Sequence, residues 1–212
     1  MVASVTHRLA GTLVTQEVFA MARADDLSQL PAGLPVPVDD GACDHLPGMR
    51  VPPVELPATS GGTVRLDALP GRTVVYCYPR TGSPDDPPPP GWDAIPGARG
   101  CTPETCAFRD NHGGFLDLGV LVLGVSTQTT EEQREMVGRL GVPFDVLSDA
   151  DLRLARALDL PTFEVAGLTL IKRLTLVLDD GAVTHVFYPV FPPDRHAGEV
   201  LDWLSRAGAT AG

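Results

Sequence analysis

The chain has 212 residues and a mass of 22.4 kDa, and 43% of its residues are hydrophobic, so it is large enough for one domain with a sizeable core and an extension. Its formal net charge of −11 disfavours nucleic acid and anionic membranes as partners, because no run of Lys or Arg offsets that charge. No apolar stretch approaches the ~20 residues that a membrane-spanning helix needs.

The first part of the chain is predicted to be an extension over residues 1–44. Its start, residues 1–26, carries Thr15, Gln16 and Glu17 inside its apolar stretch, which argues against a cleaved export signal. We expect a short amphipathic helix or a poorly ordered segment there. Four cysteines, two of them close together, do not resemble a secreted disulfide framework, so a cytoplasmic location is predicted.

A domain is predicted from residue 45 to residue 212. It begins with short strands and Gly/Pro turns that indicate a hairpin, followed by a β-rich run over 72–78 that is typical of a strand buried on both faces. Residues 81–97 then form a proline-rich insertion. Four successive prolines exclude a helix and cannot donate to a sheet, so this is a loop. We interpret it as a surface insertion, with a proline-rich recognition motif as the alternative.

Strand and helix patterns alternate after this loop. The pattern favours a mixed α/β sheet covered on both faces. The predicted elements are a strand at 120–126, a helix at 129–140 with a capping box of Thr129 and Glu132, a strand at 143–147, a helix at 148–158 capped by Ser148, a hairpin at 172–190 turning at Asp180-Gly181, and a closing helix at 194–207.

The segment GCTPETCAFRD, residues 100–110, holds two of the four cysteines. Pro103 and Glu104 favour a helix beginning here, which places Cys101 at a helix N-terminus, where unpaired N–H groups stabilise a thiolate. In an intact helix the Cα atoms of Cys101 and Cys106 are about 8–9 Å apart. A disulfide needs less than about 7 Å, so the pair can bond only if the helix unwinds. This suits a cycling redox pair better than a permanent crosslink.

Two other interpretations of the pair stay open on the residues alone. Both cysteines can be small buried hydrophobic side chains. Zinc is the other option, although His45 and His112 do not form a second paired-ligand cluster, so no metal or organic cofactor is predicted.

This segment resembles the active-site stretch of the peroxiredoxins, most closely the Q-type group, also called bacterioferritin-comigratory proteins. The similarity runs from about residue 45 to 204 and includes VVYCYPR, VLGVST, FDVLSD and KRLTLVLDDG. The resemblance implies a thioredoxin-like three-layer α/β/α fold with a central mixed sheet. It also implies reduction of hydrogen peroxide or organic hydroperoxides by an atypical 2-Cys enzyme.

The resemblance also assigns roles to residues of this chain. Cys101 matches the nucleophile that attacks the peroxide and Cys106 the resolving thiol. Glu104 matches the active-site glutamate of the family, Arg173 the arginine that faces the sulfur, and Pro79 the proline at the head of the active-site loop.

The chain departs from the family at one position. Ala98 stands where the family has Thr or Ser three residues before the nucleophile, so the hydroxyl that holds the peroxide is missing. Thr81, Thr102 or the backbone N–H groups of Gly100 and Cys101 are the candidates to replace it.

The predicted cycle forms a sulfenic acid on Cys101, then a disulfide between Cys101 and Cys106 that an external dithiol, such as thioredoxin, reduces. Hydroperoxide and reductant are the predicted partners, and the chain is expected to be a monomer or a homodimer. Two other functions stay open: a thioredoxin-like disulfide oxidoreductase or peroxide sensor, although the chain lacks C-x-x-C, and a redox-inactive binding module that uses the proline-rich loop.

Other side chains receive structural interpretations. Cys77 is expected to be a buried hydrophobic residue and Cys43 an idle thiol in a loop. His112, His185 and His196 are expected at the surface or at caps. Trp92 is expected to shield the pocket or to anchor the insertion, and Arg109 to pair with Asp110 or to support Arg173 or Glu104.

Overall fold

The computed structural model describes residues 4–9, 12–17, 30–84 and 87–209. Its centre is a five-stranded mixed sheet in the order β11-β10-β5-β6-β7. The strands are β5 (Arg72–Cys77), β6 (Leu121–Ser126), β7 (Val146–Ser148), β10 (Leu174–Asp179) and β11 (Ala182–Phe187). The first three are parallel, and β10 pairs antiparallel with both β5 and β11.

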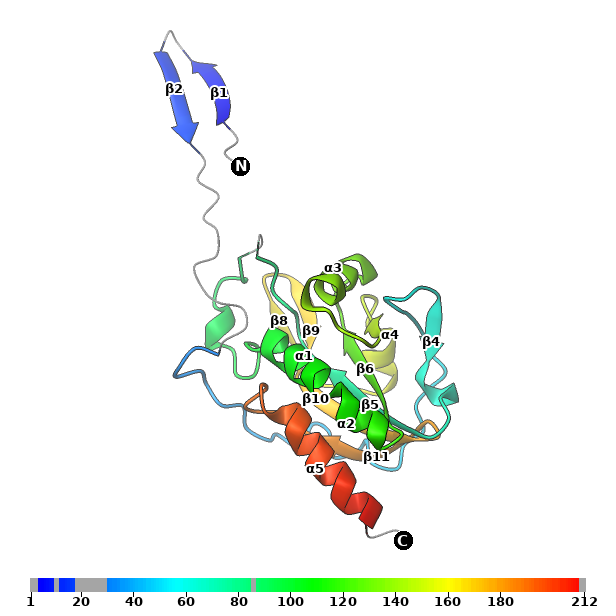
Figure 1. The fold of residues 1–212 in the computed structure, drawn as a ribbon. Helices are drawn as coiled ribbons and strands as arrows, with labels where there is room; N and C mark the ends of the chain where they lie inside the picture. The colour runs from blue at the N-terminus through cyan, green and yellow to red at the C-terminus, as the bar shows by residue number, and fades with distance from the viewer. Residues whose placement is uncertain (1–3, 10–11, 18–29, 85–86, 210–212) are drawn as a thin grey trace.

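Both faces of this sheet are covered, which gives three layers (Figure 1). Alternate side chains of β5 point to opposite faces: Val74 and Tyr76 belong to one buried cluster, Val75 and Cys77 to the other. The helices are α1 (Cys101–Asp110), α2 (His112–Asp117), α3 (Thr130–Leu140), α4 (Arg153–Ala157) and α5 (His196–Ala209).

The two clusters assign the helices to the two faces. Side chains of α1, α2, α3 and α5 pack with Val74 and Tyr76, whereas α4 and the segment around Leu46 and Leu56 pack with Val75 and Cys77. The prediction of a three-layer α/β/α fold with a central mixed sheet is confirmed.

Three further strand pairs complete the chain. They are β1 (Ser4–Leu9) with β2 (Thr12–Glu17), β3 (Glu55–Pro57) with β4 (Thr63–Arg65), and β8 (Thr162–Val165) with β9 (Leu168–Ile171). The β3–β4 hairpin was predicted. The helix predicted near the N-terminus is wrong for residues 4–17, which form the β1–β2 hairpin, and the rest of that prediction, residues 18–26, lies outside the described residues.

Most predicted elements are confirmed with small changes in their ends. The capping box of α3 forms as expected, and the β10–β11 turn places Asp180 and Gly181 at φ of 47° and 76°, as a two-residue hairpin requires. The larger differences are two: the strand predicted at 143–147 begins only at Val146, and the helix predicted at 148–158 spans only Arg153–Ala157.

The cap predicted for α4 is wrong. Ser148 ends β7 and donates its hydroxyl to the Gln128 carbonyl at 2.6 Å. The neighbouring Asp149 caps the helix instead, since its two carboxylate oxygens each accept a hydrogen bond at 2.9 Å, from the N–H groups of Leu154 and Ala155.

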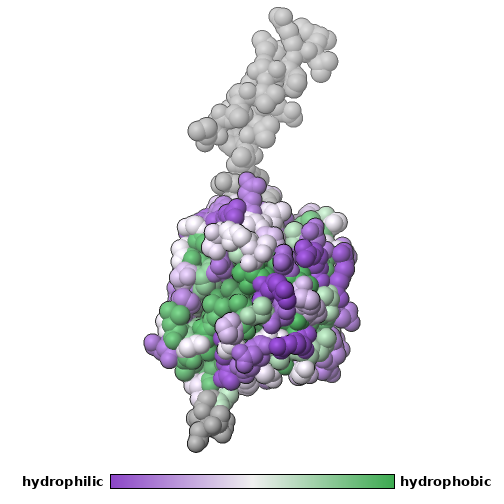
Figure 2. Space-filling view, turned by 90° about the vertical axis from the view of Figure 1, so that its right-hand side faces the viewer, coloured by the Kyte–Doolittle hydropathy of each residue, from purple (hydrophilic) through white to green (hydrophobic). Residues whose placement is uncertain are grey.

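The surface is mixed in character. Figure 2 shows one face on which hydrophobic side chains form a green area bordered by hydrophilic ones. In the described ranges, no helix is long and apolar enough to cross a membrane. The large hydrophobic residues with exposed side chains there are Val36, Val38, Leu116, Leu118, Leu121 and Leu168.

The division into an extension of residues 1–44 and a domain of 45–212 stays a prediction. Residues 30–44 nevertheless lie against the body of the protein. Cys43 is buried in the same cluster as Leu46.

Replacing Asp149 with Ala is expected to destabilise the protein by about 1–2 kcal/mol, because two buried N–H groups at the start of α4 lose their acceptor. Urea unfolding measures the change, and Asp151→Ala, at an exposed position two residues later, is the matched control. Equal stability of the two variants would contradict the capping role of Asp149.

Candidate active site

The topology brings three segments together at one edge of the sheet. The parallel strands β5 and β6 end there, and the chain leaves them as Tyr78-Pro79-Arg80-Thr81 and as Thr127-Gln128. Strand β10 runs the other way, and Leu174 pairs with Cys77, so Arg173 arrives at the same edge from the opposite direction. The carboxyl ends of parallel strands are a common place for ligand sites in α/β folds.

Helix α1 begins at Cys101, directly at this edge. Gly100 precedes it with φ of 105° and ψ of 15°, a conformation that favours glycine. The Cys101 side chain is only 2% exposed. Its sulfur accepts a hydrogen bond from Arg173 Nη2 at 3.1 Å and lies 3.6 Å from the Ala98 carbonyl, to which a thiol can donate.

Both terminal nitrogens of Arg173 form contacts in this site. Its Nη1 forms a buried ion pair with Glu104, whose carboxylate comes from the first turn of α1. Its Nη2 also lies 3.3–3.4 Å from the carbonyl oxygens of Gly97, Ala98 and Arg99. One guanidinium therefore holds the nucleophile, the glutamate and the backbone that leads into the helix.

The sulfur is subject to opposing electrostatic effects. Burial raises the pKa of the Cys101 thiol, the charge of Arg173 lowers it, and the carboxylate of Glu104 raises it again. The net direction is upward in this closed site, because burial outweighs the charge of Arg173, and a thiolate favoured by the helix end and Arg173 stays a prediction. Burial raises the pKa of Glu104 as well, to about 7, against the influence of Arg173.

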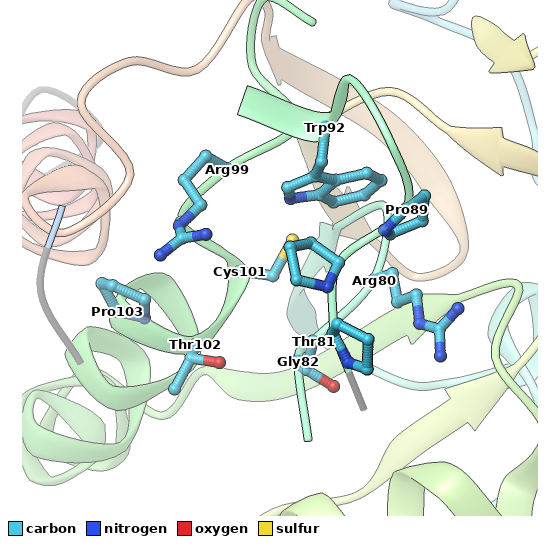
Figure 3. A pocket seen from close by; sticks show the side chains of 12 residues that line it. Arg80, Thr81, Gly82, Pro89, Trp92, Arg99, Cys101, Thr102 and Pro103 are labelled. Atoms are coloured by element: carbon cyan, nitrogen blue, oxygen red, sulfur yellow. The ribbon is translucent and has the colours of Figure 1, made fainter. Parts of the chain in front are cut away.

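Cys101 forms one wall of a small cavity with a volume of about 30 Å³. Since about 10–15 Å³ accommodates one water molecule, only a group of about two heavy atoms fits beside the sulfur. Figure 3 shows the sulfur facing Trp92 and the proline rings. The lining residues are Arg80, Thr81, Gly82, Pro87, Pro88, Pro89, Trp92, Arg99, Gly100, Cys101, Thr102 and Pro103.

The proline-rich loop is part of this cavity. Its interpretation as a surface insertion is therefore incomplete, because Pro87, Pro88 and Pro89 line the space in front of the sulfur. Trp92 is buried, lines the cavity, and packs against Phe163 with ring centroids 6.2 Å apart. Both roles considered for Trp92 are thus present in the structure.

Thr81 and Thr102, the two candidate hydroxyls, both line the cavity and are buried. The Thr81 hydroxyl and N–H both donate to Gln128 Oε1, at 3.0 and 2.9 Å. Gln128 is fixed in turn, since Ser148 donates to its carbonyl. The hydroxyl proton of Thr81 thus points to Gln128, which leaves its oxygen able to accept a hydrogen bond.

Cys106 lies one and a half turns along α1 and is partly exposed. All four cysteines are free and α1 is intact, as expected for the reduced form of a pair that can bond only after unwinding. Burial raises the pKa of the Cys106 thiol, and Arg109 lowers it. Arg109 pairs with Asp110 at 2.7 Å, as one of the two predictions had it, and donates to the Leu140 carbonyl at 2.7 Å.

The remaining side chains singled out in the sequence lie as follows. Pro79 is buried next to the cavity residues Arg80 and Thr81. Cys77 is buried, as predicted, and Cys43 is also buried, not exposed; burial raises the pKa of the Cys43 thiol to about 12, which is consistent with an idle thiol.

The surface or capping role predicted for His196 is wrong. The ring is 1% exposed and hydrogen-bonds to the Thr175 hydroxyl at 2.8 Å. Burial, together with the charge of Arg173, lowers the pKa of His196 to about 3, so the ring is neutral.

Sequence reasoning missed two contributors to the site. The backbone of Arg80 hydrogen-bonds to the Cys101 sulfur, and Gln128 orients Thr81. Arg80 lies three residues after β5 and Gln128 two residues after β6, at the edge where α1 begins. In the sequence, only this position after a predicted strand indicates a role in the site.

The chain is similar to known proteins over most of its length. The family model described as Redoxin matches residues 46–201. Peroxiredoxin Q of Sedum lineare is 32% identical over 159 residues, which cover 74% of this chain and 76% of that protein. Peroxiredoxin Q of Oryza sativa subsp. japonica is also 32% identical, and the match spans only 65% of its length.

Solved structures show the same fold. Peroxidoxin BcpB of Mycobacterium tuberculosis is 28% identical, with a TM-score of 0.62 over 76% of this chain and 98% of that one. Peroxiredoxin Q of Xanthomonas campestris is 25% identical, with a TM-score of 0.57 over 81% and 96% of the two chains. The fold and the buried cysteine define a thioredoxin-fold protein with a thiol site. The chain belongs to the redoxin family, and its relatives within that family are peroxiredoxins of the Q/Bcp group.

Replacing Glu104 with Gln is expected to lower the pKa of Cys101, because it removes a negative charge that competes for Arg173. The pH dependence of Cys101 alkylation, in a Cys106→Ser background, measures the change. Glu131→Gln, at an exposed position of α3, is the control. A Cys101 pKa that stays the same or rises in Glu104→Gln would show that the two acids do not compete.

Proposed function

We propose that this protein is a thiol-dependent peroxidase that reduces hydrogen peroxide or organic hydroperoxides at Cys101. The observation that carries the proposal is the Cys101 sulfur at the head of α1, 3.1 Å from the buried cation of Arg173 and open to a cavity of about two heavy atoms. The names of the relatives support it.

The first step transfers one oxygen atom. The Cys101 thiolate attacks one oxygen of ROOH, the O–O bond breaks, and the leaving oxygen takes a proton to give ROH while the sulfur becomes a sulfenic acid, Cys–SOH. Negative charge develops on the leaving oxygen during this step. Arg173 stabilises it, since its guanidinium is already fixed by Glu104 and three carbonyl groups and needs no reorganisation.

Ionisation of the sulfur is coupled to Glu104. Because burial raises the pKa of both groups, the single charge of Arg173 favours one negative partner rather than two. A protonated Glu104 leaves the guanidinium to the thiolate. Protonation of Glu104 thus allows Cys101 to be a thiolate in a buried site that disfavours two negative charges.

Thr81 takes the place of the missing hydroxyl at Ala98. Its proton is held by Gln128, so its oxygen accepts the hydrogen bond of the peroxide O–H. This contact orients the peroxide and turns its O–H group away from the Cys101 sulfur. Thr102 lines the same cavity from the helix side.

The second step joins the two cysteines. The first turns of α1 unwind, the Cys106 sulfur attacks Cys101–SOH, and a disulfide and one water molecule form. A dithiol protein such as thioredoxin then reduces the disulfide by exchange, which restores both thiols. The cycle needs neither metal nor organic cofactor.

One equivalent of hydrogen peroxide, or of cumene hydroperoxide, added to the reduced protein is expected to produce a Cys101–Cys106 disulfide, detected by mass spectrometry of peptides. Cys106→Ser is expected to stop at the sulfenic acid or to proceed to the sulfinic acid with excess oxidant. Cys43→Ser is the matched control and keeps the disulfide. Intact thiols at both positions after oxidation would refute the peroxidase.

Thr81→Val is expected to slow the oxidation of Cys101 by roughly 10–100-fold, since one transition-state hydrogen bond is worth about 1.5–3 kcal/mol in a buried site. Thr81→Ser is expected to retain most of the rate. Thr102→Val tests the other hydroxyl in the same stopped-flow assay. A larger loss in Thr102→Val than in Thr81→Val would assign the peroxide contact to Thr102.

A further inference from the structure

Residues 30–40 form a strap that precedes the part of the chain matched by the family model. In Figure 1 this segment passes beside the loop that leads to α1. Asp40 fastens its end: its carboxylate accepts hydrogen bonds of 2.8 Å from both Lys172 Nζ and the Tyr188 hydroxyl. Lys172 is the immediate neighbour of Arg173 in the chain.

The hydrogen bonds of Asp40 with Lys172 and Tyr188 are insensitive to pH near neutrality. The hydrogen bonds from Lys172 and Tyr188 lower the pKa of Asp40 to about 2. The pKa of Tyr188 is raised to about 12, by burial and by its bond to Asp40. The three groups therefore keep their charge states over the whole physiological range.

The strap also contacts the backbone in front of the nucleophile. A Cβ atom placed on Gly100 would lie 2.7 Å from Leu30 Cδ2 and closer still to Pro193 Cγ, and one placed on Gly97 would lie 3.6 Å from Pro37 Cγ. Residues 97–100 are thus enclosed by the strap, by Pro193 and by the guanidinium of Arg173, which faces the carbonyl groups of residues 97–99.

Between its contacts the strap spans a hollow. Val36 and Val38 line a cavity of about 300 Å³ together with Phe163 and Tyr188, and both valines are largely exposed. The strap is therefore held at a few points, so the loss of one contact is expected to release it.

We propose that the strap, held by Asp40 and Leu30, keeps residues 97–100 at the edge of the sheet and thereby slows the unwinding of α1 that the Cys101–Cys106 disulfide requires. The inference rests on the proposed peroxidase cycle for its chemical consequence. Cys101 can reach Cys106 only if the start of α1 leaves the sheet edge, and Gly100 then leaves its contact with Leu30. By opposing that movement the strap prolongs the life of the sulfenic acid.

The prolonged intermediate has two fates. It condenses with the Cys106 thiol to give the disulfide and water, or it reacts with a second hydroperoxide to give the sulfinic acid and an alcohol. The strap therefore sets the ratio between turnover and overoxidation without touching substrate.

Two variants release the strap at different points: Asp40→Ala and Leu30→Ala. Asp39→Ala is the matched control, because the Asp39 carboxylate accepts its hydrogen bond from Gly41 within the same turn. In reduced protein, amide hydrogen exchange over residues 97–106 is expected to rise severalfold in both variants and to stay unchanged in the control. Unchanged exchange over 97–106, with increased exchange over 30–40, would overturn the proposal.

A rapid-quench experiment with one equivalent of hydrogen peroxide measures the chemical consequence. Disulfide formation is expected to be about three- to tenfold faster in both variants, with the loss of the Cys101 thiol changed by less than twofold, and less sulfinic acid is expected with excess peroxide. Equal disulfide rates would refute the effect on the cycle. If exchange rises but no variant reacts with peroxide, the strap's hold on α1 stands and the peroxidase proposal falls.

Discussion

The site depends on one buried cation that two acids share. Arg173 contacts the Cys101 sulfur and the Glu104 carboxylate, both buried, and the second N–H of its Nη2 faces three backbone carbonyls. A buried charge is tolerated only when it is paired and hydrogen-bonded. Because the positive charge suffices for one negative partner, the protonation state of the glutamate and that of the sulfur are linked. Burial is the main cause of the raised pKa of each group, and the carboxylate of Glu104 raises the pKa of Cys101 further.

The sheet makes this sharing possible. Two parallel strands deliver backbone and hydroxyl groups to one edge, and an antiparallel neighbour delivers the arginine to the same edge from the other direction. The cation thus comes from the residue directly before β10, whose first residue, Leu174, pairs with Cys77, whereas the sulfur comes from a helix terminus. The rigid part of the site is the strand side, and the part that must move is the helix side. The strap of residues 30–40 lies where the two meet.

Much of this arrangement could be predicted from the sequence. Hydrophobic runs and turn dipeptides located the strands, and the first helical residues placed Cys101 at a helix start. Other features depended on tertiary structure. The β8–β9 hairpin turns at Ala166 and Gly167, both with positive φ, and alanine is an unusual residue there. The position of the proline-rich loop over the cavity, the burial of His196, and the cap formed by Asp149 instead of Ser148 depend on neighbours distant in the sequence.

The proline wall of the cavity has a consequence for selectivity. Pro87, Pro88 and Pro89 have no amide hydrogen, so this side of the cavity provides surface without a donor from their backbone. An alkyl substituent is larger than the space beside the sulfur, so it has to extend past this wall, where it makes van der Waals contact but gains no directional bond from the three rings. Discrimination among bulky oxidants on this side is therefore a matter of shape, and changes in the insertion would alter which oxidants enter while leaving the reacting atoms as they are.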